Sequence, residues 1–180
     1  MSLLGYNPLS IYNGRGAFEA MGTGLEMEPE LDIAFKSNFA FLNRETGIVE
    51  RRRVDREFDK WGLELVDVID GLVIPGYEEY KVACKWATEH RCGIRVSGPG
   101  LSYFISGQDP LRDNLPLPKV VSTLKNDSKA EFTAQLVQKL SDTIIEVLSN
   151  HPINLKRKEE GKTYTNYITL RGCGQRLKAK

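Results

Sequence analysis

The chain has 180 residues, of which 41% are hydrophobic and 27% are charged, a composition typical of one soluble globular domain. Lysine and arginine total 25 against 24 for aspartate and glutamate, so net charge favours neither nucleic acid nor an acidic membrane surface. No apolar run approaches the ~20 residues of a membrane span, and no signal-peptide core is present. We therefore expect a cytoplasmic protein with no nucleic-acid partner and no membrane partner.

The three cysteines, an odd number, fit a reducing compartment. Cys84 and Cys92 flank a predicted hairpin turn symmetrically, and we expect a reduced, packed pair there rather than a disulfide. The cysteines and histidines show neither C-x-x-C nor H-x-x-x-H spacing, so no metal site is predicted from Cys84, His90, Cys92, His151 and Cys173.

The chain is interpreted as a lead-in or cloning remnant at residues 1–4, a single domain at residues 5–174 and a basic tail at residues 175–180. Within the irregular opening, a short helix is expected from Gly14 to Met21, because glycines at positions 22 and 24 would end it.

The first regular element is a predicted hairpin. An alternating, aromatic-rich run from Leu31 to Phe41 indicates a strand, Asn43 to Gly47 a turn, and Ile48-Val49 the returning strand. A helix is then expected from Val54 to Ile69, because apolar residues recur there at spacings of three and four. Trp61 is assigned to the core side of that helix rather than to a stacking surface.

Between the hairpin and the helix lies an arginine cluster, with four arginines within six residues: Arg51, Arg52, Arg53 and Arg56. Planar guanidinium groups suit phosphate or carboxylate oxygens, so the cluster is the sharpest chemical signal in the chain. The alternative is a solvated face, balanced by the nearby acids Glu50, Asp55, Glu57 and Asp59. Nucleic-acid binding is a third reading, although it usually needs a broader basic surface.

A second hairpin is predicted from Tyr80 to Ala87 and from Arg91 to Ser97, with His90 facing solvent in its turn. Its second strand ends at Gly98-Pro99-Gly100, inside the stretch from Glu89 to Pro110. This turn either presents a ligand site or is a tight structural loop, and its spacing fits no phosphate cradle.

The second half of the chain begins with an extended segment from Asp109 to Lys125 that contains three prolines. Capping-box spacing from Ser128 to Glu131, followed by apolar residues at every fourth position from Phe132 to Leu148, then predicts a long helix that ends near Asn150. A charged turn is expected from Asn154 to Lys162, and a last strand from Thr163 to Leu170.

The order of six segments resembles the archaeal-type cofactor-independent phosphoglycerate mutases, from Gly5 to Gly174. The segments are GRGAFEAMGTGLE, DIAFKSNFAFL, the arginines after GIV, EHR with GPGLS and QDP, HPIN, and NYITLRGCG. The resemblance implies an isomerase of glycolysis and gluconeogenesis in the alkaline-phosphatase-like superfamily, and this chain looks like its inserted substrate-covering domain. The phosphatase core, with its nucleophilic serine and two divalent metal ions such as Mn, Mg or Zn, is absent from this sequence.

The resemblance also implies site residues. By the family pattern D-R-R-A-G-R, Arg52, Arg53 and Arg56 occupy the arginine positions and are expected to bind substrate. Arg51 stands in place of the leading acid, and Val54-Asp55 replaces Ala-Gly. Compared with the family patterns R-G-E-G-L-S and T-D-T-D-P, this chain lacks the arginine and two of the three acids, so that Asp109 is the only retained carboxylate. No catalytic residue and no metal ligand is assigned to this chain.

We therefore expect an α+β domain with a mostly antiparallel sheet of two hairpins plus a terminal strand, and about three helices packed mainly on one face. The expected function is the substrate-binding insertion domain of a phosphoglycerate mutase, incomplete for catalysis alone, with phosphoglycerate and the phosphatase core as partners. The alternative is a diverged, non-catalytic ligand-binding or interaction module. Oligonucleotide binding through the arginine cluster and the Lys178/Lys180 tail would depend on salt.

Overall fold

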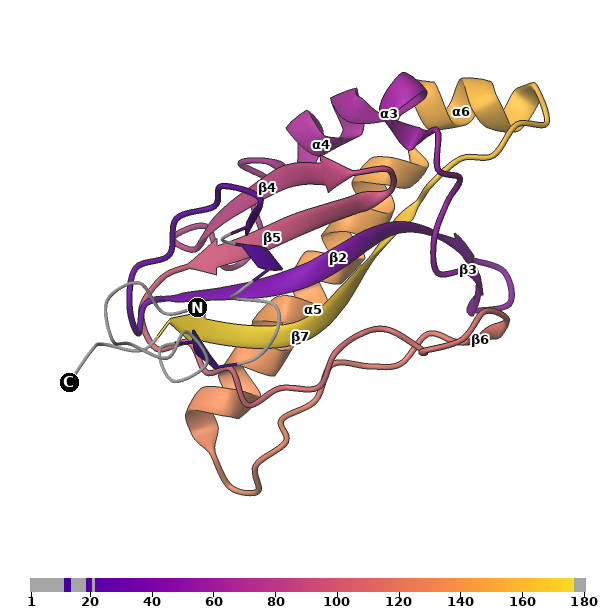
Figure 1. Cartoon of the computed structure of the whole chain (residues 1–180). Helices are drawn as coiled ribbons and strands as arrows, with labels where there is room; N and C mark the ends of the chain where they lie inside the picture. Colours follow the sequence, from indigo (N-terminus) through magenta and orange to yellow (C-terminus); the bar gives the residue numbers. More distant parts are fainter. Residues whose placement is uncertain (1–11, 14–18, 21, 177–180) are drawn as a thin grey trace.

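The computed structural model describes residues 12–13, 19–20 and 22–176 (Figure 1). The expected lead-in at residues 1–4, most of the expected helix from Gly14 to Met21, and the Lys178/Lys180 tail lie outside the described residues.

The described strands form one antiparallel sheet around the long strand β2, Asp32–Asn43 (Figure 1). Its two neighbours are β5, Arg91–Ser97, and β7, Tyr167–Arg176. The outer strands are β4, Lys81–Thr88, beside β5, and β1, Tyr12–Asn13, beside β7. The end of β2 also pairs with β3, Ile48–Arg51, which in turn pairs with β6, Leu115–Pro116. Both predicted hairpins, β2–β3 and β4–β5, are therefore confirmed.

The terminal strand differs from its prediction at both ends. It begins at Tyr167 rather than Thr163, and it continues through Arg176. The extension exists because Gly174 and Gln175 pair with Ala34 and Ile33 of β2. Residues 175–176 consequently belong to the sheet and not to a tail.

Four helices lie wholly within the described residues: α3, Phe58–Trp61; α4, Leu63–Ile69; α5, Ser128–Ser149; and α6, Pro152–Glu159. The single helix predicted from Val54 to Ile69 was wrong, because it starts later and is broken at Gly62. The ring of Phe58 lies against Gly62 so closely that an added Cβ atom would be 2.2 Å from Phe58 Cε2. The Val54 amide donates to Phe39 O, 2.9 Å away, and this bond holds Val54 beside β2, ahead of the first helical residue.

The long helix α5 was predicted correctly, although its N-cap is Asp127 rather than Ser128. The Asp127 carboxylate accepts from the Ala130 amide at 2.8 Å. The apolar stripe of α5 includes Leu136, Leu140 and Ile144, all fully buried against the sheet. Each such side chain contributes about 2 kcal/mol of burial free energy before conformational entropy is subtracted.

Helix α6 was wrongly predicted as a charged turn. Its N-terminus is capped by His151, whose Nδ1 accepts from the Ile153 amide, and Pro152 occupies the first turn. The buried side chain of Asn154 donates through Nδ2 to Leu148 O and Thr165 O, so this polar helix is anchored by hydrogen bonds rather than by an apolar stripe.

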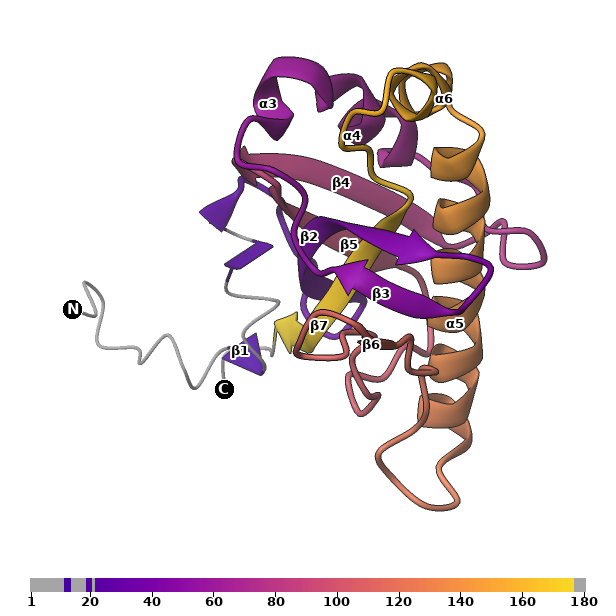
Figure 2. The ribbon, with the colours of Figure 1, turned by 90° about the vertical axis from the view of Figure 1, so that its right-hand side faces the viewer.

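The layers follow from these elements. Helices α3, α4 and α5 contribute to one large core on a single face of the sheet (Figure 2), as predicted. On the opposite face, Ala20, Leu25 and Met27 pack on Ala34. None of the helices in the described part of the chain is long and apolar enough to cross a membrane.

The Gly-rich turn after β5 has a structural role. A Cβ atom on Gly98 would lie 2.2 Å from the ring of Tyr80, and the Tyr80 hydroxyl donates to Pro99 O at 2.7 Å. Gly98 is therefore needed for the close packing of Tyr80, which supports the structural reading of the turn.

Candidate functional site

The site is centred on the buried carboxylate of Asp109, which lies between two arginines. Arg52 donates to it through both arms of its guanidinium, with Nε 2.5 Å from Oδ1 and Nη2 2.7 Å from Oδ2. Arg171 at the surface end of the site places its Nε 3.0 Å from Oδ2. The Asp109 side chain is only 2% exposed, so this carboxylate fixes both guanidinium groups from inside the domain.

Electrostatic interactions between Asp109 and the two arginines stabilise the charged forms of these side chains. Burial alone would raise the pKa of Asp109, but hydrogen bonds from Arg52 and the Leu111 amide, together with the charges of Arg52 and Arg171, hold that pKa below its ordinary value. The pKa of Arg52 is raised, mainly by its hydrogen bond to Asp109. Asp109 is therefore an anchoring carboxylate, and two of the Arg52 donors face it rather than solvent.

The loop after Asp109 closes over the arginine segment. Asp113 Oδ1 accepts from the Arg52 amide at 2.8 Å, and the Asn114 amide donates to Val49 O at 2.7 Å. Leu111 has a φ of 70° in the left-handed region, an unusual conformation for a non-glycine residue. These contacts shape an open pocket of about 270 Å³ lined by Arg52, Arg53, Leu111, Arg112 and Asp113.

Arg53 and Arg56 lie on a backbone that is fixed by their neighbours, while their own guanidinium groups remain free of internal partners in the described residues. Arg52 is held by Asp109 and Asp113, Val54 is buried and bonded to Phe39, and Asp55 accepts from the Trp61 indole. Arg53 and Arg56 are exposed, and neither has an ion pair with any residue that the structure describes. The segment thus alternates between anchored residues and free guanidinium groups.

The four residues chosen from sequence therefore fall into two sets. Arg52 and Asp109 bind each other, whereas Arg53 and Arg56 face solvent. Sequence reasoning did not assign Arg171 to the site, although the strand-ending motif NYITLRGCG contains it. It also missed Tyr167, whose buried hydroxyl donates to Gln108 O beside Asp109. Burial is the main reason why the pKa of Tyr167 is raised, so this hydroxyl is a neutral donor.

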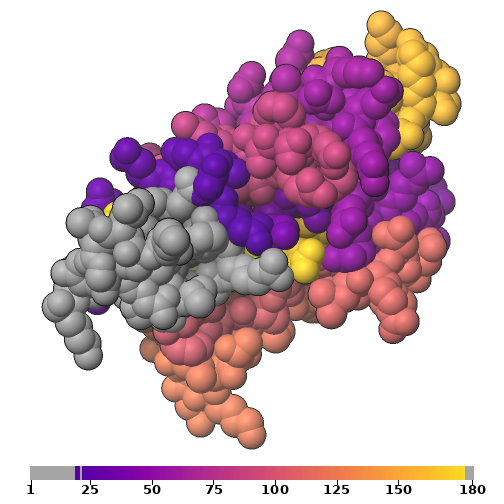
Figure 3. All heavy atoms as spheres, viewed as in Figure 1, coloured from indigo at the N-terminus to yellow at the C-terminus, as the bar shows by residue number. Residues whose placement is uncertain are grey.

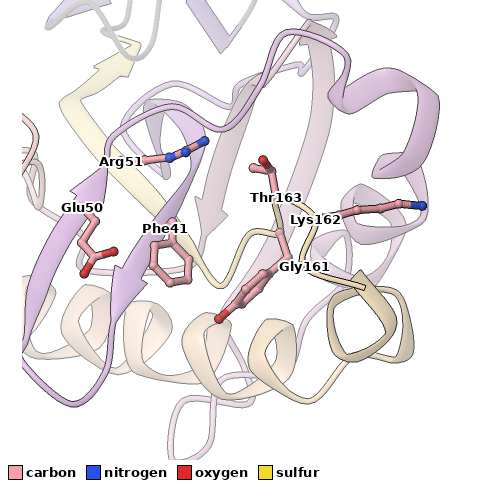
Figure 4. Close-up of a pocket in the computed structure, with 7 residues that line it drawn as sticks. Phe41, Glu50, Arg51, Gly161, Lys162 and Thr163 are labelled. Atoms are coloured by element: carbon pink, nitrogen blue, oxygen red, sulfur yellow. The ribbon is translucent and has the colours of Figure 1, made fainter. Parts of the chain in front are cut away.

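Arg51 points elsewhere. It lines a separate pocket of about 240 Å³ together with Phe41, Glu50, Gly161, Lys162, Thr163 and Tyr164 (Figure 4). In the close-up Arg51 extends toward Thr163, while Lys162 points away from it. Arg51 therefore takes no part in the pocket beside Asp109.

His90 was wrongly predicted to face solvent. It is 4% exposed, and neither ring nitrogen has a hydrogen-bond partner among the described residues. The reason is the register of the sheet: Arg91 pairs with Asn38, and His90 O accepts from the Phe39 amide, which places His90 against β2. Its pKa is lowered, first by burial and then by Arg91, with smaller effects from Arg53 and Arg56.

This depressed pKa predicts acid sensitivity. Between the folded pKa of His90 and the ordinary value of 6.5, the unfolded chain binds more protons than the folded chain. The contribution of His90 to the free energy of unfolding is therefore present in full above pH 6.5 and decreases as the pH falls below that value. We expect His90→Asn to remove this component when unfolding by urea is measured at several pH values. His151→Asn is the matched control and should retain the pH dependence, and an unchanged pH profile for His90→Asn would contradict the prediction.

The cysteines are free in this structure. Cys84 and Cys92 are both buried, and the pKa of Cys84 is raised by its hydrogen bond with Cys92 and by burial. This agrees with the predicted reduced pair. Within residues 12–13, 19–20 and 22–176, no group of three or more histidine, cysteine or acidic residues could hold a metal ion.

The fold and the site define an open antiparallel α+β domain with an arginine-lined pocket at the edge of its sheet. A family model described as 2,3-bisphosphoglycerate-independent phosphoglycerate mutase matches residues 1–154, and the chain belongs to this family. The predicted family resemblance is confirmed.

Individual relatives agree with this assignment. The 2,3-bisphosphoglycerate-independent phosphoglycerate mutase of Picrophilus torridus is 40% identical over 97% of this chain and 40% of its own length. That of Methanobrevibacter smithii is 38% identical, over 97% of this chain and 42% of its own length. The solved structure of the cofactor-independent phosphoglycerate mutase from Thermoplasma acidophilum superposes with a TM-score of 0.85 at 38% identity, covering 99% of this chain and 46% of that chain. The chain thus spans less than half the length of these relatives.

Proposed function

We propose that this chain is the substrate-binding insertion domain of a cytoplasmic phosphoglycerate mutase that interconverts 3- and 2-phosphoglycerate. The observation that carries the proposal is the pair of exposed, unpaired guanidinium groups, Arg53 and Arg56, on a backbone fixed at Arg52, Val54 and Asp55. The fixed backbone limits the conformational entropy that these two arginines lose when their guanidinium groups bind phosphate or carboxylate oxygens.

Each site residue has a separate role in this proposal. Arg53 and Arg56 contact the anionic substrate directly. Arg52 keeps Nη1 for the substrate while its other donors are held by Asp109, and Asp109 orients Arg52 and Arg171. A cover of this kind also excludes water while a phosphoryl group moves between two hydroxyls.

The chemistry itself is assigned to a phosphatase core that this chain does not contain. In the proposal, that core supplies the nucleophilic serine and the two divalent metal ions. When bound, the metal ions would stabilise charge on the transferring phosphoryl oxygens. The residues of this chain bind and orient the substrate, and the chain alone is expected to be inactive.

The proposal is tested by titrating the 180-residue chain with 3-phosphoglycerate, glycerate and inorganic phosphate, followed by amide and arginine Nε NMR signals. We expect millimolar 3-phosphoglycerate to shift the signals of Arg52, Arg53 and Arg56 more than either fragment does, because only the whole molecule carries both anionic groups. Arg44, which is bound by Glu146, serves as the internal control. Unchanged signals at all three arginines would overturn the proposal.

A further inference from the structure

Asp55 poses a difficulty for an anion site. It lies in the sequence between Arg53 and Arg56, the two arginines with free guanidinium groups. A carboxylate that turned toward these groups would pair with them and compete with an incoming phosphate or carboxylate. The contacts of Asp55 show how the fold avoids this competition.

The Asp55 carboxylate is held on the side of helices α3 and α6. Trp61 Nε1 donates to Asp55 Oδ1 at 3.2 Å, and Arg157 Nη2 lies 3.9 Å from Oδ2. The Arg157 guanidinium also stacks on the Trp61 ring, with Cζ 3.8 Å from the ring centroid. Trp61 was predicted to be a core residue, and it does pack against the edge of the core, but its ring also carries Arg157.

Arg157 is itself well fixed. Its Nε donates to Thr163 O at 2.5 Å, and its side chain is only 18% exposed. The space-filling view shows α6 lying against the magenta segment that contains α3 (Figure 3). A partly buried, oriented guanidinium can therefore balance the Asp55 charge without reaching into the pocket of Arg53.

We propose that Arg157 and Trp61 act as positioning residues that mask the Asp55 carboxylate and so keep Arg53 and Arg56 available to an anionic ligand. This inference rests on the proposed function of the arginine segment. It assigns a role to α6, a helix that has no contact with the pocket beside Asp109. It also explains how a carboxylate is tolerated where the family pattern has glycine.

The decisive test is a suppressor experiment on anion affinity. Removing the Arg157 charge leaves the Asp55 carboxylate without its compensating cation, and this negative charge is expected to weaken anion binding roughly fivefold at low salt. Arg157→Gln should therefore raise the Kd for inorganic phosphate and for 3-phosphoglycerate by about that factor. Adding Asp55→Asn in the same chain should restore the affinity, because the competing charge is gone.

Lys158→Gln is the matched control, since it removes the same charge from the same helix at an exposed position. It should change the Kd by less than about twofold, because exposed charges are well screened. Unfolding of each variant by urea shows whether the fold is intact. A merely structural role of Arg157 predicts no rescue by Asp55→Asn, since that substitution repairs no packing.

Two indole signals report on the contact itself. The Trp61 indole signal should move in Arg157→Gln and in Asp55→Asn, whereas the signal of Trp86, which donates to Glu89 O, should stay in place. Wild-type affinity in folded Arg157→Gln, or a double variant as weak as Arg157→Gln, overturns the masking role alone. Phosphate binding without preference for 3-phosphoglycerate overturns the proposed substrate alone, and no anion binding overturns both.

Discussion

Replacing Asp109 by asparagine is expected to lower the free energy of unfolding by about 3 kcal/mol at pH 7, because two arginines lose the carboxylate that compensates their partial burial. Asp109 is 2% exposed and Arg52 14% exposed in their side chains, so the Arg52 charge would remain in a partly desolvated place without its partner. Urea unfolding of wild type and Asp109→Asn measures the difference directly.

Asp113→Asn is the control for this substitution. Asp113 also bonds to Arg52, but it accepts from the backbone amide at an exposed position, so its replacement should cost less than about 1 kcal/mol. Because the folded pKa of Asp109 is depressed, its contribution is present above the ordinary value of 3.8 and disappears as pH falls through the folded pKa. Equal stability of wild type and Asp109→Asn at neutral pH would show that the ion group contributes nothing net.

The second large effect concerns Arg53 and Arg56. We expect the double variant Arg53→Gln/Arg56→Gln to lower kcat/KM by about 10³-fold, because the proposed site loses two charge-assisted contacts to the substrate. The measurement uses a chimera in which this chain replaces the matching segment of the Thermoplasma acidophilum mutase, whose structure superposes on it with a TM-score of 0.85.

The control for the double variant comes from the same cluster. Arg51→Gln removes a neighbouring charge, but Arg51 faces the separate pocket with Thr163, so its effect should stay below about threefold. The unsubstituted chimera must show mutase activity. If it is inactive although folded, the departures of this chain from the family patterns have abolished the activity, and the diverged-module alternative is then favoured.

The anchored and free arginines divide the work of one short segment. The Arg52 guanidinium binds Asp109 and the Arg52 amide binds Asp113, whereas the Arg53 and Arg56 guanidinium groups are exposed and are proposed to bind the ligand. Such preorganisation reduces the entropy lost on binding. The arginines of this segment are thus not equivalent. Substitution of Arg52 should change mainly the stability of the domain, whereas substitution of Arg53 or Arg56 should change mainly the affinity for the ligand.

The sequence by itself determined the local elements and the family. Alternation predicted β2, β-rich segments bounded by turn residues predicted β4 and β5, a repeat of four residues predicted α5, and the order of motifs identified the phosphoglycerate mutase family. These features depend on neighbours within a few residues, or on motif order, and both can be read along the chain. The break between α3 and α4 at Gly62 was not predicted, because the stripe of apolar residues continues across it.

Only the tertiary structure decided which charged groups are available. Arg52 and Asp109 are separated by 57 residues, and no periodicity shows that they pair. The burial of His90 follows from the register of β5 on β2, and the masking of Asp55 follows from α6, whose cap and buried Asn154 depend on distant partners. Pairing and burial are properties of segments brought together by the sheet, so the final assignment of the arginines required the folded chain.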